Sequence, residues 1–417
     1  MPTGSDTLMA KRHRAEKRFR RYGQCAIGMA LLALVLLLAT IVQRGWQGFF
    51  YTEIRVTLDM GDAKLGTDTA ALRHADMSPY IKKALLKEFA ANDRRAMREL
   101  VGLVSSGATQ SVRNALMAHP EWANETHDFW VPASDAVDRA QKGGETVKTP
   151  LIARKISDRQ LGWLEKLSGD HRLRTHLNPL FFSTGDSRQP ELAGFAGSVK
   201  GSLLTLLSCM LLAFPVGIMA AIYLEEFARK TKLTGWIEIS VNNLAAVPSV
   251  VFGLLGLSVY LNLMGIPRSA SLAGGLTLAL MILPTLIIAT RASLRAIPDS
   301  IRDAARGLGA SPMQVVLHHT LPLAMPGIMT GTILGLARAM GETAPLLMIG
   351  MVAFVADIPQ SPLDPATSMP VQIYLWATSP EQSFADKTAA GILMLLAALI
   401  LMNSIAILIR KRFEHRW

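Results

Sequence analysis

Six apolar segments constrain this 417-residue chain more than any other feature of its sequence. Crossing the hydrocarbon core of a bilayer takes about twenty consecutive apolar residues, and 50% of the residues here are hydrophobic. The segments run over 25–43, 198–224, 240–263, 272–290, 326–352 and 389–410. Prolines within the third, fourth and fifth segments are tolerated where neighbouring helices satisfy the carbonyl groups that they leave free. The sequence therefore predicts an all-α membrane protein folded as a six-span helical bundle.

Lysine and arginine residues concentrate in the loops that six crossings would place on one side of the membrane. They cluster in 11–21, 229–232, 291–306 and 410–416. Because short cytoplasmic loops carry an excess of Lys and Arg, we expect both termini to be cytoplasmic and the segment 44–195 to lie outside. The net charge of +11 is then mainly an orientation signal. Anionic lipid headgroups are the additional partner that it implies, and no nucleic-acid partner is expected.

The first apolar segment follows a basic arm, 1–24, as the core of a secretory signal would. Its apolar core is long for a signal peptide and no small-x-small cleavage site follows it, so we expect an uncleaved membrane anchor. Cys25 and Cys209 lie in or beside different spans. This placement gives neither a disulfide framework nor a metal-binding cluster.

The polar segment 44–195 is long enough to form a soluble domain with its own core. Apolar residues alternate over 54–58 as in a strand, 78–104 has the spacing of one amphipathic helix, and 129–131 has the composition of a second strand. An inserted α+β domain is the prediction. His171 and His176 have no partner carboxylates or cysteines at metal spacing, so we expect satisfied or surface histidines here.

A polar stretch, DSIRDAARGLGASPMQVVLHHTLP over 299–322, separates the fourth and fifth apolar segments. The spacing predicts a helix over 299–308 with two adjacent alanines on a face small enough to enter a groove. Gly309 can adopt the left-handed conformation that ends such a helix. Ser311 and Pro312 are a good N-cap and first-turn pair, so a second short helix restarts there. Pro322 is expected to block any simple continuation.

This stretch resembles the EAA loop of ABC-transporter permeases, the cytoplasmic element that docks on a partner ATPase. The residues that carry the resemblance, and that it assigns to ATPase coupling, are Asp303, Ala304, Ala305, Gly309, Leu321 and Pro322. Asp303 stands where the family usually has Glu, which keeps the charge, and His319 stands where it usually has Ile.

Three further short sequence motifs narrow the resemblance to phosphate-specific permeases of the PstA type. They are AIYLEE at 221–226, VPSVVFGL at 247–254 and RAMGETAPL at 338–346. The GETAP motif is the one that distinguishes phosphate permeases from other ABC permeases. The resemblance implies a type I ABC permease core over 196–417 in the bacterial inner membrane. The segment 44–195 resembles an extension that a subset of these permeases carries, but the resemblance does not indicate what the extension does. We expect it to help receive a substrate-binding protein.

Arg338 and Glu342 are four residues apart, so a helix would place them on one face. A charge in the middle of a spanning helix costs about 2.5–3.5 kcal/mol on insertion scales, and such residues usually face a bundle interior, a partner or a water path. An arginine fork suits a phosphate anion. We expect Arg338, Glu342 and Thr343 to line the substrate pathway; a structural ion pair that locks two helices is the alternative.

Other charged and small residues near the spans have simpler expected roles. Arg291 and Arg295 would anchor to lipid headgroups, with contact to departing phosphate as the alternative. Glu225 and Glu226 would be solvated or pair with loop cations. The glycines at 253, 256, 331 and 335 would permit close packing of helices.

The chain contains no Gly-Lys dipeptide and therefore no Walker A loop. We expect a permease subunit that is not itself an enzyme and holds no cofactor, with ATP and Mg bound by a partner ATPase. The resemblance implies a second, related permease chain, an ATP-binding subunit dimer and a periplasmic phosphate-binding protein. Another oxyanion as substrate, a phosphate-sensing signalling component and a secondary transporter are the alternatives left open.

Overall fold

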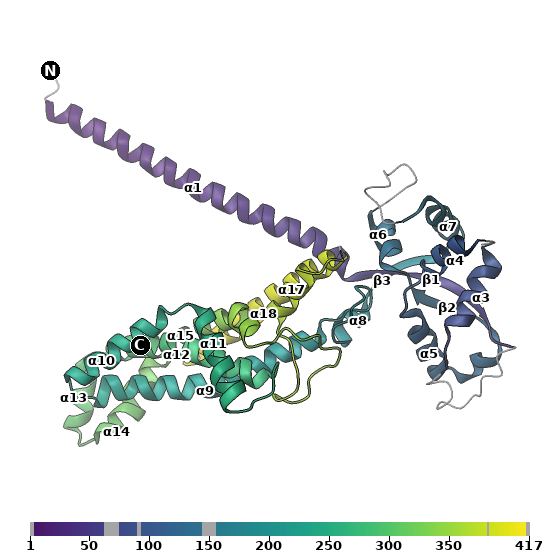
Figure 1. Ribbon diagram of the computed structural model, residues 1–417. Helices are drawn as coiled ribbons and strands as arrows, with labels where there is room; N and C mark the ends of the chain where they lie inside the picture. Colours follow the sequence, from purple (N-terminus) through teal and green to yellow (C-terminus); the bar gives the residue numbers. More distant parts are fainter. Residues whose placement is uncertain (1–3, 62–74, 90–92, 144–155, 382, 414–417) are drawn as a thin grey trace.

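The molecule is elongated, with a bundle of long helices at one end and a small sheet-containing body at the other (Figure 1). The computed structural model describes residues 4–61, 75–89, 93–143, 156–381 and 383–413. Helix α1 (Gly4–Gly48) extends away from the bundle and leads directly into the first strand.

The sheet has three antiparallel strands in the order β2-β1-β3. They are β1 (Phe50–Asp59), β2 (Thr126–Pro132) and β3 (Leu173–Leu177). Ile54 in the central strand lies opposite Val131 and Leu173. Ile54, Val56 and Leu58 are almost fully buried in the core of this body, because alternate side chains of a strand point to the same face. The strands predicted at 54–58 and 129–131 are confirmed.

Among the described residues, seven short helices surround or follow the sheet. They are α3 (Ser78–Glu88), α4 (Arg94–Val101), α5 (Ala108–Ala118), η1 (Pro120–Asn124), α6 (Asp135–Gly143), α7 (Asp158–Gly169) and α8 (Pro179–Ser183). The prediction of one amphipathic helix over 78–104 was wrong. Phe89 and Asp93 both have extended backbone, so α3 and α4 are separate helices; α3 buries Ile81 and Leu85, and α4 buries Ala96 and Leu100.

Together with α1, the bundle provides five helices that are long and apolar enough to span a membrane, and one bent pair, among the residues that the structure describes. Its elements are α9 (Ala196–Ile222), α10 (Lys232–Ala245), α11 (Ser249–Gly256), α12 (Ser271–Arg295), α15 (Leu321–Gly341), α17 (Met369–Ala377) and α18 (Phe384–Phe413). Single π-helical turns extend α9 to Phe227 and α11 to Leu263. With α1, this composition is that of a helical membrane protein.

The third apolar segment, 240–263, was predicted as one helix and is instead broken. Helices α10 and α11 meet at 99°, because Pro248 holds an extended conformation (ψ 136°) and proline cannot continue a helix. Glu238 of α10 contacts the C-terminal end of α12 through Arg291, whereas Gly256 of α11 lies against Thr277 in the N-terminal half of α12. The pair therefore runs along α12 from one end to the other in two pieces.

The fifth apolar segment, 326–352, was also misplaced. A continuous helical stretch runs from Pro312 to Gly341, through α14 (Pro312–Gln314) and a π-helical turn (Val315–Thr320) into α15. Pro322 does not block it, because its missing N–H falls just after the π-helical turn, where the hydrogen-bonding pattern changes in any case. Beyond Gly341 the chain unwinds, and the rest of the predicted segment, up to residue 352, contains the short helix α16 (Ala344–Met348).

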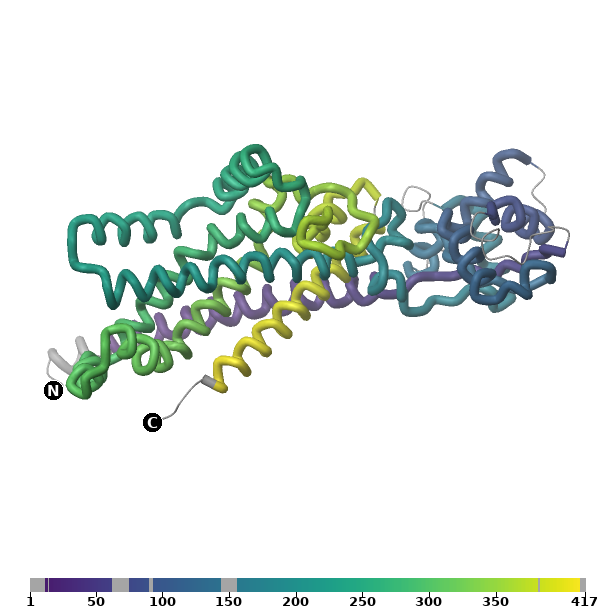
Figure 2. Tube along the Cα trace, turned by 90° about the horizontal axis from the view of Figure 1, so that it is seen from below, coloured from purple at the N-terminus to yellow at the C-terminus, as the bar shows by residue number. Residues whose placement is uncertain are grey.

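The two bodies are joined by a firm junction. Phe49, Phe181, Phe195 and Trp376 form a chain of ring contacts with centroids 5.3–5.7 Å apart between successive members. The C-terminal end of α1 lies against the first turns of α18, close enough that a Cβ on Gly48 would sit 2.4 Å from the Asp386 carbonyl oxygen. The tube view shows the sheet-containing body stacked on the end of the bundle (Figure 2).

Candidate functional site

The polar loop between α12 and α15 folds largely as its sequence predicts. Helix α13 (Asp299–Gly307) is followed by Gly309 at φ +87°, a conformation that glycine adopts without strain. Ser311 caps the next helix in a reciprocal capping box with Gln314. The expectation that both alanines share an outward face was wrong in part, because Ala305 is 5% exposed and packs inward.

The outward face of α13 is formed by other residues of the same loop. Asp303 and Ala304 are exposed, and Leu308 is 90% exposed. An apolar side chain left this open, beside a small alanine on a short protruding helix, suits insertion into a groove of another protein. Leu321 and Pro322 lie at the start of α15, behind this face.

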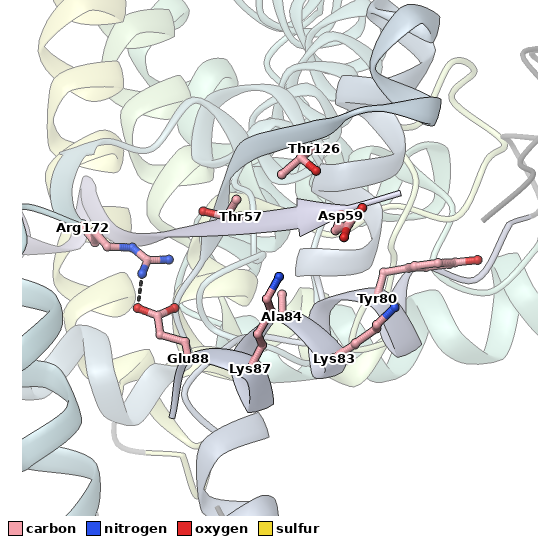
Figure 3. A pocket seen from close by; sticks show the side chains of 9 residues that line it. All are labelled: Thr57, Asp59, Tyr80, Lys83, Ala84, Lys87, Glu88, Thr126 and Arg172. Atoms are coloured by element: carbon pink, nitrogen blue, oxygen red, sulfur yellow. Dashed lines mark hydrogen bonds and ion pairs between the residues drawn. The ribbon is translucent and has the colours of Figure 1, made fainter. Parts of the chain in front are cut away.

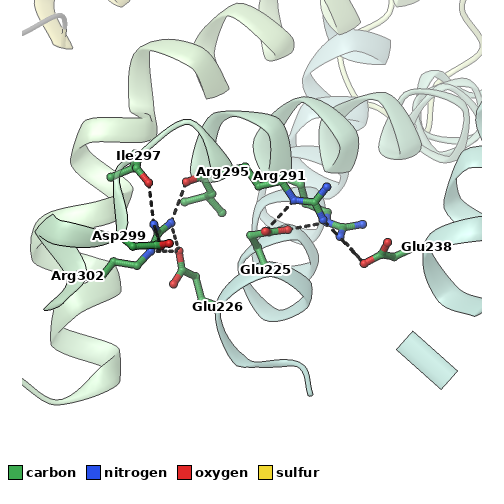
Figure 4. A network of polar contacts seen from close by, with 9 residues as sticks. Glu225, Glu226, Glu238, Arg291, Arg295, Ile297, Asp299 and Arg302 are labelled. Carbon is green, nitrogen blue, oxygen red and sulfur yellow. Dashed lines mark hydrogen bonds and ion pairs between the residues drawn. The ribbon is translucent and has the colours of Figure 1, made fainter. Parts of the chain in front are cut away.

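Arg302 fastens α13 to the bundle (Figure 4). Its guanidinium lies 2.9 Å from Glu226 Oε1 and 3.0 Å from Asp299 Oδ1. It also donates to the carbonyl oxygens of Ile297 and Leu294, each at 2.8 Å. The side chains of Arg302 and Glu226 are only 10% and 7% exposed. This ion pair therefore joins α13 to the end of α9 and is largely shielded from solvent.

A second group of ion pairs lies beside the first (Figure 4). Arg291 contacts Glu225 at 3.2 Å and Glu238 at 2.5 Å, and Arg295 contacts Glu225 at 2.8 Å. These pairs connect α12 with the end of α9 and with α10. The expectation that Arg291 anchors to lipid headgroups was therefore wrong, because the residue is 9% exposed and its charge is satisfied within the protein.

Arg338 and Glu342 lie at the far end of α15 rather than in the middle of a helix. Arg338 belongs to the last turn and Glu342 is the C-cap residue, with extended backbone (ψ 124°). Arg338 Nε lies 3.5 Å from Glu342 Oε1. Thr343 precedes α16 and is half-buried. The GETAP motif thus forms an unwound corner between two helices, which brings the three predicted pathway residues together.

The Arg338 side chain faces away from the bundle of this chain. Its side chain is 47% exposed, and Leu334, one turn earlier on the same side of α15, is 64% exposed. An arginine directed into lipid would be costly. The geometry therefore suits a surface that another protein chain covers, with a guanidinium held by a carboxylate at its edge.

Close helix packing supports this corner from behind. A Cβ on Gly253 would lie 2.7 Å from the Pro345 carbonyl oxygen, and one on Gly256 would lie 2.5 Å from Thr277 Oγ1. Gly331 approaches Ala289 of α12 equally closely. The predicted packing role is confirmed for these three glycines. It is wrong for Gly335, where an added Cβ would make an ordinary contact at 3.9 Å.

Sequence reasoning missed two groups of polar residues. Glu226 was expected to be solvated or to pair with a loop cation, and it pairs with Arg302; the sequence did not specify which cation. The junction of the two bodies also contains buried charges, among them Glu191 and Lys387 at 8% and 6% exposed. His176 was expected to be a satisfied or surface histidine, and its Nε2 lies 3.0 Å from Glu53 Oε2 across the strand pair. No sequence spacing predicts a contact that depends on strand register.

No group of three or more His, Cys, Asp or Glu side chains able to hold a metal ion occurs within 4–61, 75–89, 93–143, 156–381 and 383–413. The polar clusters at α13 and at the α15 corner consist instead of alternating guanidinium and carboxylate groups. Such an arrangement positions helices and presents charge. It offers no nucleophile with an adjacent base.

Comparison with known families gives two matches along the chain. Residues 213–417 match the model described as "Binding-protein-dependent transport system inner membrane component", and residues 6–150 match a domain of unknown function, DUF3333. An inward-facing structure of the MetNI methionine ABC transporter is 18% identical with a TM-score of 0.43, covering 52% of this chain and 95% of that one.

Curated relatives match about half of the chain. The phosphate transport system permease protein PstA of Yersinia pestis is 33% identical over 224 residues, which cover 53% of this chain and 74% of the relative. PstA 1 of Mycobacterium tuberculosis strain H37Rv is 33% identical over 222 residues, covering 52% of this chain and 70% of the relative. This chain therefore belongs to the PstA family of phosphate transport system permease proteins.

Proposed function

We propose that this chain is the transmembrane permease subunit of an ATP-driven importer of inorganic phosphate. The observation that carries the proposal is the 33% identity to PstA of Yersinia pestis over 224 residues, which cover 74% of that relative. Membership in a permease family also means that the chain itself is not an enzyme. ATP and Mg would be bound by a separate ATPase.

The substrate path would run along the outward face of α15, between this chain and a second, related permease subunit. Arg338, Glu342 and Thr343 would line it. A phosphate ion needs compensating positive charge in the membrane, and arginine stays protonated at any accessible pH. Glu342, 3.5 Å from Arg338, would hold the guanidinium in place and weaken its grip on the anion, because a pathway must also release what it binds.

Coupling to the ATPase would use the exposed face of α13. Asp303, Ala304 and Leu308 would enter a groove of the ATP-binding subunit dimer, and Gly309 would set the angle to the next helix. When the ATPase dimer closes, α13 would move, and the ion pair between Arg302 and Glu226 would carry that motion to α9. Leu321 and Pro322 would carry it into α15.

Orientation and domain roles complete the proposal. The N-terminal arm 1–24, the C-terminus and the coupling loop 299–322 would be cytoplasmic, in a bacterial inner membrane. Residues 25–43 would form the first span, 44–195 a periplasmic α+β domain and 196–417 a type I ABC permease domain. The periplasmic domain would help receive a phosphate-binding protein. Deletion of 50–190 that left uptake intact in a normally assembled complex would contradict this role.

Vesicle transport tests the central proposal directly. Vesicles containing this chain with its partner permease, ATPase and binding protein should take up labelled phosphate when ATP is supplied, and excess sulfate should compete poorly. Arg338→Gln should abolish uptake while the complex still assembles. Normal phosphate uptake by assembled Arg338→Gln would remove Arg338 from the pathway. Absence of phosphate uptake by the assembled wild-type complex would point to another oxyanion.

A further inference from the structure

A groove of about 340 Å³ lies where α1, α17 and α18 meet, and the transport proposal does not use it. Residues of α1 form one wall, and the end of α17 with the first turns of α18 forms the other. We propose that this groove binds a zwitterionic phospholipid whose headgroup carries a primary ammonium, as in phosphatidylethanolamine. The inference rests on the groove and on the membrane location of these helices, and it does not depend on the transported substrate.

Small residues open the groove beside a tight helix crossing. A Cβ on Gly45 of α1 would lie 2.8 Å from the Ala389 carbonyl oxygen of α18. Ala385, Ala389 and Ile392 line the groove and follow one another at three- and four-residue intervals, so they share one face of α18. From Ala385 to Ile392 this face extends for about 10 Å along the helix axis. The groove is therefore long enough for a lipid headgroup and the first carbons of an acyl chain.

The groove lies on the outside of the bundle, where lipid can reach it. Beyond the crossing with α18, α1 runs away from the bundle (Figure 1). Three of the lining residues, one from each helix, are exposed, namely Arg44, Ala377 and Ala385. Its occupant therefore comes from the surroundings of the helices.

The two ends of the groove differ in polarity. The apolar end lies at the predicted spans 25–43 and 389–410 and is formed by Ile41, Ala389 and Ile392. The polar end lies just beyond both predicted spans and is formed by Arg44, Ser379 and Glu381. A phospholipid has the same division at the edge of the hydrocarbon core, with acyl chains on one side and the headgroup on the other.

The polar end presents one charge of each sign, and both are available to a ligand. Among the hydrogen bonds and ion pairs of the described residues, the side chains of Arg44 and Glu381 have no partner, and both residues are exposed. Asp386 also attracts Arg44, but from beyond ion-pair distance, and it lines a separate cavity at the junction of the two bodies. The guanidinium and the Glu381 carboxylate are thus free to bind opposite charges of one molecule.

A phosphodiester and a primary ammonium in one headgroup complement both of these charges. The planar guanidinium of Arg44 can donate two hydrogen bonds to phosphate oxygens, while an ionised Glu381 accepts N–H groups from the ammonium. A choline headgroup has no N–H to donate. A glycerol headgroup has no positive charge to place against Glu381. The groove should therefore prefer phosphatidylethanolamine to phosphatidylcholine and to phosphatidylglycerol.

A pocket of the sheet-containing body, between α3 and the end of β1, has a different character (Figure 3). Nearly all of its lining side chains have polar ends, and its arginine, Arg172, is held by Glu88. It offers neither an apolar end nor an uncommitted guanidinium, so the features that suit a phospholipid are specific to the groove at α1.

Lipid binding can be measured by native mass spectrometry of the purified full chain, titrated with the three lipids carrying identical acyl chains. Phosphatidylethanolamine should bind most tightly. Arg44→Gln should weaken its binding at least about tenfold, because hydrogen bonds to charged groups are among the strong ones. Arg268→Gln is the matched control, since Arg268 is exposed in the loop before α12 and does not line the groove.

Two further variants test selection and location. Glu381→Gln removes the charge that repels phosphatidylglycerol, so the preference for phosphatidylethanolamine over it should fall from about tenfold or more to a few-fold. Ala385→Leu fills the groove without changing its charge and should weaken binding of all three lipids.

Three results would overturn the inference. The first is equal binding of the three lipids to wild type. The second is an affinity for phosphatidylethanolamine that neither Arg44→Gln nor Ala385→Leu changes. The third is loss of the Arg44-dependent binding when the chain assembles with its partner permease, which would mean that protein, and not lipid, occupies the groove.

Discussion

Replacing Arg302 by Met should detach α13 from the bundle without preventing the chain from folding. The substitution keeps an unbranched side chain of similar reach, which can still pack between α13 and α9. It removes a guanidinium that lies 2.9 Å from Glu226 and 3.0 Å from Asp299. It also leaves the Leu294 and Ile297 carbonyl oxygens without the donor that each has at 2.8 Å.

The magnitude follows from burial. Asp299 is exposed and would lose little, since surface ion pairs contribute about 0–1 kcal/mol. Glu226 is 7% exposed, and removing one partner of a buried pair costs about 3–5 kcal/mol because the other charge is left unpaired. If this cost falls on the local opening of α13, hydrogen-exchange protection there should drop by about two to four powers of ten.

Hydrogen exchange of the purified chain, read by mass spectrometry over α13, measures this directly. Arg306→Gln is the matched control on the same helix. Its pair with Asp303 spans 3.5 Å between side chains that are 54% and 72% exposed, so protection should fall by less than about tenfold. In the assembled transporter, ATP-driven uptake should fall strongly for Arg302→Met and little for Arg306→Gln.

A clear result would refute this reasoning. If α13 in Arg302→Met exchanges no faster than in Arg306→Gln, the buried pair does not hold the helix. Equal loss of protection throughout α9, α12 and α13 would mean instead that the pair stabilises the whole bundle end. The double variant Arg302→Met, Glu226→Met separates these cases, because removing both charges should restore most of the protection at α13.

Two further predictions concern packing and protonation. Gly253→Val should lower the thermal midpoint and reduce uptake, because a Cβ would lie 2.7 Å from the Pro345 carbonyl oxygen and overpacking costs about 1–3 kcal/mol. An unchanged midpoint would count against this close approach. The control Gly335→Ala, with its Cβ 3.9 Å from the nearest side chain, should change the midpoint little. Burial raises the pKa of Glu191, although Ser105 donates to it. Its contribution to stability is therefore present below the unfolded-state pKa and is lost as pH rises through the folded-state pKa. Glu191→Gln should flatten the dependence of the unfolding free energy on pH. Identical slopes of unfolding free energy against pH for variant and wild type would contradict this.

Local sequence rules predicted the elements that depend on neighbouring residues. The left-handed Gly309 and the Ser311 cap are set by residues within one turn, so their outcome could be read from the chain. The same holds for the alternation at 54–58. Prolines gave poorer guidance. Pro248 breaks a predicted span, whereas Pro322 breaks nothing, because a π-helical turn precedes it.

Contacts between distant elements were the part that sequence could not supply. Arg302 and Glu226 are 76 positions apart, and nothing in either local sequence specifies which carboxylate a loop arginine will meet. The same applies to Glu53 and His176, which meet only because β1 and β3 pair in one register. Arg291 was assigned to lipid for a related reason: an arginine at the end of a span has the same sequence signal whether it meets a headgroup or a buried glutamate.

The continuous helix from Pro312 to Gly341 changes how a signal from the ATPase would reach the pathway. Two short helices ending at Pro322 would need a flexible link before α15, and a flexible link absorbs motion. One 30-residue helix instead joins the Ser311 cap, next to α13, to the corner that holds Arg338 and Glu342. Because a helix is stiff along its axis, a tilt imposed at its first turn must appear at its last. The exposed Arg338 would then move relative to whatever covers it, while the Arg302 pair would keep α9 moving with the same loop.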